Sequence, residues 1–174
     1  MNMKPYTVYI RAVKGKSLID RLIQWKTGSV YNHVEFFYPF DGTIDSVYKY
    51  YRNHLCVIGA HPHGGIQIRP FDYIGKVNYD VYSIKLTQKQ VIELRNFCLS
   101  KMKIPYSWGD IFDDVFNVSF KLSHRAYDCS EFVAKALEHV GVYLVNRKAL
   151  KQSYRITPRD ICFSSLLFYE GVKK

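Results

Sequence analysis

Short runs of alternating apolar and polar residues occupy much of the first half of the chain, a pattern typical of half-buried strands. The runs are rich in β-branched and aromatic residues, which favour extended structure. Turns are expected between them at Asp41-Gly42 and Gly64-Gly65. The pattern therefore predicts strands at Tyr6–Val13, His33–Tyr38, Ser46–Tyr51, Leu55–Ala60, Ile66–Pro70 and Tyr79–Leu86.

One helix interrupts this series of strands. Leu18, Leu22 and Trp25 recur at helical spacing, which predicts a helix from Ser17 to about Lys26. Gly28 is its expected end, because glycine readily adopts the left-handed conformation that terminates helices.

Helical spacing replaces the alternation in the second half of the chain. Thr87-Gln88-Lys89-Gln90 has the pattern of a capping box and predicts a helix that runs to about Met102. Asp128 is expected to cap a helix over Cys129–Val140 that has one continuous apolar face. Thr157-Pro158 predicts a last short helix through Leu167, since proline is favoured in the first helical turn.

Strands gathered first and helices later indicate an α+β fold, with an antiparallel sheet packed by helices on one side. The 174 residues contain 48% apolar residues and no repeat or linker rich in Pro, Gly or Ser. Residues 1–174 are therefore expected to form a single domain. Because neither a signal peptide nor a membrane-spanning apolar segment is recognisable, the sequence predicts a cytoplasmic protein.

The formal net charge of +10 favours contact with an anionic partner, such as a membrane surface, an acidic cell-wall polymer or nucleic acid. No nucleic-acid-binding signature accompanies the charge, so specific nucleic-acid binding is not expected. The four cysteines have no Cys-x-x-Cys spacing, which indicates free thiols in a reducing compartment. They are Cys56, Cys98, Cys129 and Cys162.

Cys129 differs from the other cysteines because it falls in the first turn of a predicted helix. The positive end of a helix dipole stabilises a thiolate and so lowers the pKa of a cysteine. The free N–H groups of the same turn can bind the oxyanion of an acyl-transfer intermediate. Most cysteines that are not in disulfides simply pack as small apolar side chains. The residues around Cys129 therefore have to show whether it is a nucleophile or a core residue.

The segment Tyr127–Val133, with Asp128-Cys129-Ser130, resembles the nucleophile motif of the NlpC-type papain-like cysteine hydrolases. Ile104–Gly109 is similar to the Pro-Tyr-x-Trp-Gly stretch that precedes this cysteine in the family, where the tyrosine lies near the oxyanion site. Glu131 replaces the usual glycine, a variant associated with the circularly permuted amidase branch. Further similarity at Gly64–Pro70 and Thr157–Asp160 extends the resemblance over most of residues 17 to 167.

The permuted order accounts for the position of the catalytic histidine. Thr27–Phe36 resembles the segment of the permuted branch that supplies the base, which implies that His33 has this role. Asn32 replaces a serine of that segment. His139 is the one histidine after Cys129, and it is expected to lie on the same helix, pointing away from the helix start.

The third catalytic residue is expected to be Glu35. Alternate residues of a strand share one face, so Glu35 can orient the imidazole of His33. Asp45 and His61 are alternatives. Many members of the permuted branch take this residue from the following strand, and Gly59 stands at that place here, which favours Glu35.

The resemblance implies a cysteine amidase or peptidase that acts without a cofactor on peptidoglycan peptides, N-acyl amino acids or other acyl amides. The oxyanion would be bound by the Cys129 backbone N–H, with help from Tyr106 or from the backbone of Tyr127 and Asp128. A lipid acyltransferase or phospholipase-like enzyme is an alternative, because the permuted branch resembles the lecithin:retinol acyltransferase group. An apolar interfacial helix would favour that alternative, and the sequence shows no convincing one. A catalytically silent binding protein of the same fold is the third hypothesis.

A cluster of histidines and one cysteine raises the question of zinc binding. Its spacing matches no familiar closed zinc site, and His61-Pro62-His63-Gly64 has the composition of a turn. No metal is therefore expected, and the cluster is interpreted as a solvated loop. Its members are His54, Cys56, His61 and His63.

Overall fold

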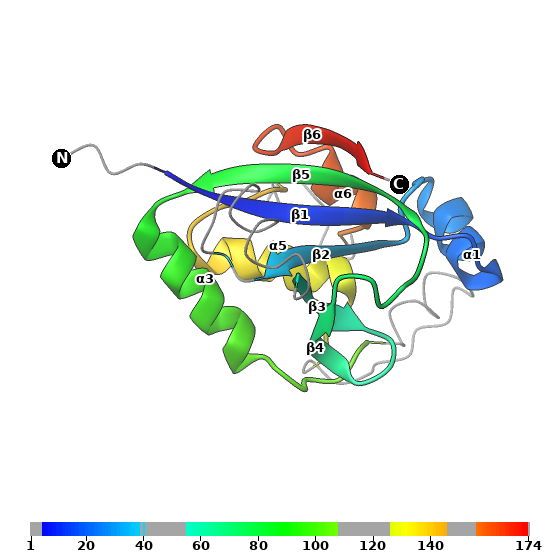
Figure 1. Cartoon of the computed structure of the whole chain (residues 1–174), viewed down its shortest axis with the longest axis horizontal. Coiled ribbons are helices and arrows are strands. Elements are labelled where there is room, and N and C mark those ends of the chain that lie inside the picture. The colour runs from blue at the N-terminus through cyan, green and yellow to red at the C-terminus, as the bar shows by residue number, and fades with distance from the viewer. Residues whose placement is uncertain (1–4, 39, 41–54, 108–125, 146–155, 174) are drawn as a thin grey trace.

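The chain forms a six-stranded antiparallel sheet with helices packed against it, which confirms the predicted α+β class (Figure 1). The computed structural model describes residues 5–38, 40, 55–107, 126–145 and 156–173. The strand order is β4-β3-β2-β1-β5-β6. The strands are β1 Tyr6–Lys14, β2 His33–Tyr38, β3 Cys56–His61, β4 Gly65–Pro70, β5 Asn78–Leu86 and β6 Phe168–Lys173.

Four helices are described, and a side chain caps the start of each. Helices α3 and α5 pack against each other, and α5 lies over β2 and β3. The helices are α1 Leu18–Thr27, α3 Gln88–Ser100, α5 Cys129–His139 and α6 Pro158–Cys162. The predicted strand Ser46–Tyr51, the turn at Asp41-Gly42 and the alternative triad residue Asp45 lie outside the described residues.

The main core lies between the sheet and α5. The predicted apolar face of this helix is buried as expected, and Phe132 makes an edge-to-face contact with Phe36 of β2 at 6.4 Å between ring centroids. Asp128 caps the helix, because its Oδ1 accepts a hydrogen bond of 2.7 Å from the backbone N–H of Glu131. The core contacts and the cap together fix where α5 begins, and therefore where Cys129 lies.

The C-terminal segment differs from the prediction. Helix α6 ends at Cys162 instead of continuing through Leu167, and the chain then forms β6, which pairs with β5 at the edge of the sheet. The apolar residues Phe168 and Val172 of β6 are 60% and 51% exposed. Since β6 is an edge strand with exposed apolar residues, it lacks the apolar-polar alternation from which the other strands could be predicted.

Within the described part of the chain, no helix is long and apolar enough to cross a membrane.

Candidate active site

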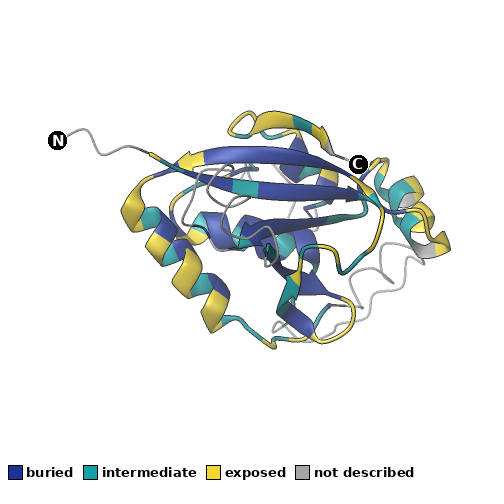
Figure 2. Cartoon of the chain, viewed as in Figure 1, coloured by how far each residue is buried: buried dark blue, intermediate teal, exposed yellow. Residues whose placement is uncertain are grey.

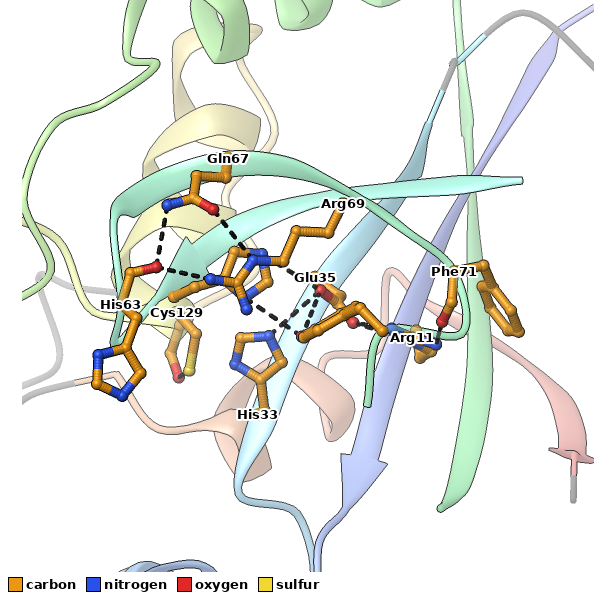
Figure 3. Close-up of polar contacts among 11 residues, drawn as sticks. Arg11, His33, Glu35, His63, Gln67, Arg69, Phe71 and Cys129 are labelled. Atoms are coloured by element: carbon orange, nitrogen blue, oxygen red, sulfur yellow. Dashed lines mark hydrogen bonds and ion pairs between the residues drawn. The ribbon is translucent and has the colours of Figure 1, made fainter. Parts of the chain in front are cut away.

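Two elements bring the predicted nucleophile and base together. His33 is the first residue of β2, and Cys129 is the first residue of α5, which packs on β2 (Figure 3). The two side chains are mostly buried, with exposed fractions of 12% for His33 and 4% for the Cys129 residue. The His33 ring is close enough to Cys129 for a side-chain hydrogen bond to contribute to the raised pKa of the imidazole.

Glu35 lies on the same face of β2 as His33, as the strand spacing predicts. The distance from His33 Nε2 to Glu35 Oε2 is 3.3 Å. Burial alone would lower the pKa of His33, but the negative charge of Glu35 and the interaction with Cys129 outweigh it and raise this pKa to about 10. His33 is therefore an imidazolium at neutral pH, with its Nε2 towards Glu35.

Arg11 of β1 holds Glu35 from the neighbouring strand. The two residues are directly opposite each other in the β1–β2 register, and both are buried. Arg11 Nε donates to Glu35 Oε1 at 2.8 Å, Nη2 donates to the same oxygen, and Nη1 donates to the carbonyl of Phe71 at 2.7 Å. This buried ion pair, which sequence analysis missed, fixes the carboxylate that orients His33.

His61 and Tyr73 complete the surroundings of Glu35. The Tyr73 hydroxyl lies 3.3 Å from Glu35 Oε2 and 3.2 Å from His61 Nδ1. His61 Nε2 is 3.8 Å from the same carboxylate oxygen and is buried without a hydrogen-bond partner among the described residues. Gly59 leaves room for Glu35, because a Cβ at position 59 would be 2.8 Å from the Glu35 Cβ.

Burial and neighbouring charges together set the protonation states of Glu35 and His61. Burial alone would raise the pKa of Glu35, but His33, Arg11 and His61 lower it to about 2. Burial and the neighbouring His33 charge lower the pKa of His61 to about 3. At neutral pH the cluster thus contains one carboxylate between an imidazolium and a guanidinium, with His61 neutral beside it.

The candidate pair lies between two adjoining hollows. The larger has a volume of about 390 Å³ and exposes His33, and the smaller has a volume of about 50 Å³ and exposes Cys129. Ile23, Asn32 and Tyr106 line both. We call these two hollows together the cleft, and His33 and Cys129 each line one of them in spite of their low exposure.

The three residues expected near the oxyanion occupy different places. Tyr106 lines both hollows, and Asp128 lines the smaller one as well as capping α5. Tyr127 packs on Phe132 of α5, while its backbone pairs with the chain on either side of Tyr106. Gly65 contributes to this arrangement because a Cβ there would be 1.9 Å from the carbonyl oxygen of Ile104.

The remaining histidines lie elsewhere. His139 is at the opposite end of α5 from Cys129, where its ring lies 4.8 Å from that of Phe97. His63 is exposed at the wall of the larger hollow, and His54 is outside the described residues. The interpretation of this segment as a solvated loop fits the exposed His63 but is wrong for His61, which is the last residue of β3, is 1% exposed and joins the cluster around Glu35.

His33, Glu35 and His61 also offer a donor set that suits zinc. One ligand atom from each lies within 4.8 Å of the others, and two histidines with one glutamate are a ligand combination of catalytic zinc sites. The unpartnered, buried Nε2 of His61 fits this use. Metal binding would employ the same imidazole that faces Cys129, so the two uses of His33 compete.

We expect a cysteine-directed electrophile to modify Cys129 faster than the other three cysteines at near-neutral pH. Cys129 opens on the cleft beside an imidazolium, whereas burial raises the pKa of the Cys56 and Cys98 thiols and raises that of Cys162 to about 12. Site-resolved mass spectrometry of the folded protein measures the four rates. Equal rates would show that Cys129 has no activated thiol.

Comparison with known proteins reveals a shared fold. The chain is similar to the solved structure of metalloprotein YiiX from Escherichia coli O157:H7, with a TM-score of 0.68, 17% sequence identity and coverage of 98% of each chain. No protein-family model matches the chain, and no curated protein matches it significantly. The similarity to YiiX concerns the fold, so the chemistry has to be argued from the site.

Proposed function

We propose that this protein is a cysteine hydrolase of the permuted NlpC type that cleaves an acyl bond through an acyl-enzyme on Cys129. The observation that carries the proposal is the convergence of His33, held by Glu35, on a cysteine at the start of α5 and at the edge of a cleft. A helix start, an imidazolium and an orienting carboxylate are the parts that activate a thiol nucleophile.

The reaction proceeds in two steps. The Cys129 thiolate attacks the carbonyl carbon and forms a thioester, and His33 gives its proton to the leaving amine as the C–N bond breaks. A water molecule then attacks the thioester while His33 accepts its proton, and the C–S bond breaks, which releases the acid and restores the Cys129 thiolate and the His33 imidazolium. The backbone N–H of Cys129 binds the oxyanion in both steps, and Tyr106, which lines the same hollow, assists it.

Arg69 supports an amide substrate that carries a carboxylate, such as a peptide or an N-acyl amino acid. It lines the larger hollow, donates to the carbonyl of His63 at 2.6 Å and to Gln67 Oε1 at 3.1 Å, and lies 5.0 Å over the Tyr73 ring. These contacts hold its guanidinium in place on the cleft wall. A positioned guanidinium binds carboxylates with favourable geometry.

A lipid ester is the second candidate substrate, and the apolar side chains around the cleft favour it. Val13, Ile74 and Val77 line the larger hollow, and the outer side of α1 beside the cleft is apolar and exposed. An acyl chain fits such a surface.

Substrate assays separate the two candidates. Hydrolysis of muropeptides, N-acyl amino acids and phospholipid esters is measured for the wild-type protein and for Cys129→Ala. Failure of every acyl substrate would contradict the proposed activity.

Activity is expected to survive chelating agents and to decrease when zinc is added. YiiX is described as a metalloprotein, and a zinc ion bound by His33, Glu35 and His61 would supply a metal-activated water. The thiol mechanism uses His33 in its free form, so a bound ion would inhibit it. Hydrolysis rates measured after dialysis against a chelator and after titration with zinc test this. Loss of activity on chelation and its recovery with zinc would contradict the thiol mechanism.

Glu35→Gln is expected to shift the alkaline limb of the kcat/KM profile to lower pH by about 1–3 units. The negative charge of Glu35 raises the pKa of His33, and the imidazolium that serves as the acid is lost when the pH exceeds this pKa. Removing the Glu35 charge lowers the pKa of His33, so activity begins to fall at a pH closer to neutral. Glu35→Asp keeps the charge and is the matched control, with a limb close to that of the wild type. An unchanged limb in folded Glu35→Gln would show that Glu35 does not act on His33.

A further inference from the structure

Helix α1 exposes a stripe of apolar side chains to solvent. Figure 2 shows exposed positions along this helix. Leu18, Leu22 and Trp25 are 85%, 40% and 78% exposed. They form one stripe along the helix, because they are separated by four and three residues. The helices of globular proteins normally turn such a stripe towards the core, so α1 has the opposite orientation to the one that folding alone would favour.

Polar contacts fix this orientation. On the inner side of α1, Asp20 Oδ1 accepts a hydrogen bond of 2.6 Å from Asn32 Nδ2. Gln24 Nε2 lies 3.1 Å from the carbonyl oxygens of both Gly15 and Val30. Turning the apolar stripe inwards would break these hydrogen bonds. The fold therefore holds the stripe on the surface.

The exposed apolar surface continues beyond α1. Val30 is 62% exposed, and Phe163 at the end of α6 is 75% exposed. Arg159 connects the two regions, since its Nη1 lies 3.3 Å from the Gly28 carbonyl oxygen and its guanidinium lies 5.4 Å over the Phe163 ring. We call this surface the apolar rim, and it consists of Leu18, Leu22, Trp25, Val30 and Phe163.

Positive charge accompanies the apolar rim. Lys16, Arg21 and Arg159 are exposed around it, and the whole chain has a formal net charge of +10. Apolar residues that include a tryptophan, flanked by exposed cations, are the composition of helices that lie in the surface of an anionic bilayer.

The apolar rim also borders the candidate active site. The inner side of α1 lines the cleft, with Asp20 and Ile23 at the larger hollow and Ile23 and Thr27 at the smaller. Any surface that covers the outer side of α1 therefore lies beside the entrance to the cleft.

We propose that the apolar rim docks the protein on an anionic lipid surface, with α1 lying in the plane of the headgroups. Leu18, Leu22 and Trp25 enter the acyl boundary, while Lys16 and Arg21 contact the headgroup phosphates. Docking in this orientation brings the cleft to the membrane, where a substrate with an acyl chain can enter it. The docking depends on the outer side of α1 and does not require the hydrolase activity proposed for Cys129.

Flotation with vesicles tests the docking. The full chain should float with vesicles of phosphatidylcholine containing roughly one third phosphatidylglycerol and only weakly with phosphatidylcholine alone, and binding should weaken as salt is raised. The triple variant Leu18→Gln/Leu22→Gln/Trp25→Gln should lose at least about 100-fold in partition coefficient. Because these side chains are exposed, the variant is expected to fold. Ile92→Gln/Leu99→Gln on α3 is the matched control, since it removes exposed apolar residues far from the rim and should bind like the wild type.

The fluorescence of Trp25 gives a second measurement. The chain has two tryptophans, Trp25 and Trp108, so a Trp108→Phe background reports on Trp25 alone. Anionic vesicles should shift its emission to the blue and protect it from acrylamide. Cys129→Ala should bind vesicles like the wild type, which separates the docking from the activity.

Three results would overturn the proposal. They are equal binding of the triple variant and the wild type, equal binding of neutral and anionic vesicles, and a stable wild-type dimer that the triple variant dissociates without any vesicle binding. The last result would assign the apolar rim to a second copy of the chain.

Discussion

His33→Ala is expected to lower kcat/KM for acyl transfer by about 10²–10⁴-fold while the protein remains folded. The imidazolium of His33 interacts with Cys129 and is held by Glu35. Its removal eliminates the acid of the first step and the base of the second. Steady-state hydrolysis of an activated acyl ester measures the loss, and circular dichroism verifies the fold.

His139→Ala is the matched control, because His139 is the one histidine that follows Cys129 in the chain. The two residues are ten positions apart on α5, about 15 Å along the helix axis, which exceeds the hydrogen-bond distance that a general base requires. The variant should therefore retain the wild-type rate. Full activity of folded His33→Ala, or a large loss in His139→Ala, would contradict the assignment of the upstream histidine as base.

Arg11→Met is expected to destabilise the protein by about 3–5 kcal/mol, because it removes the hydrogen-bonded guanidinium from the buried Glu35 carboxylate and leaves His33 as its one charged partner. Arg11 and Glu35 are 1% and 0% exposed, and two guanidinium nitrogens donate to one carboxylate oxygen. Unfolding by urea at neutral pH, followed by circular dichroism, measures the change. A change below about 1 kcal/mol would show that the pair does not hold Glu35.

The double variant Arg11→Met/Glu35→Gln controls for the loss of packing. It removes both charges, so it should be more stable than Arg11→Met alone. The pH dependence gives an independent check. The pKa of Glu35 falls from its ordinary 4.5 to about 2 in the folded protein, so its contribution to stability is present above pH 4.5 and is lost as the pH falls towards 2. This loss should be absent in the double variant.

Much of the fold was predictable because its elements have strong local signals. The capping box at Thr87, the Asp128 cap and the proline after Thr157 predicted where three helices begin, and the structure confirms these helix starts. At Thr157 the structure adds a capping box that was not predicted. The sequence patterns were less informative where tertiary contacts determine the pairing of a strand or the orientation of a helix. Strand β6 is paired through its backbone at the sheet edge, and the orientation of α1 depends on hydrogen bonds to loops that no helical period reveals.

The candidate site was predictable in part for a similar reason. His33 and Glu35 are two residues apart on one strand, so their common face follows from sequence spacing alone. Arg11 could have been suspected as a single charged residue in an apolar strand, but its partner depends on the β1–β2 register. His61 and Tyr73 reach Glu35 from β3 and from the chain after β4, and this convergence exists only in the folded sheet.

Trapping the acyl-enzyme tests the central claim most directly. The wild-type protein is mixed with an activated acyl ester, quenched in acid within the first turnover, digested and analysed by mass spectrometry. The account predicts the acyl mass on the peptide that contains Cys129, with no adduct and no turnover in Cys129→Ala. Turnover by Cys129→Ala at the wild-type rate, or an acyl group carried by another residue, would contradict it.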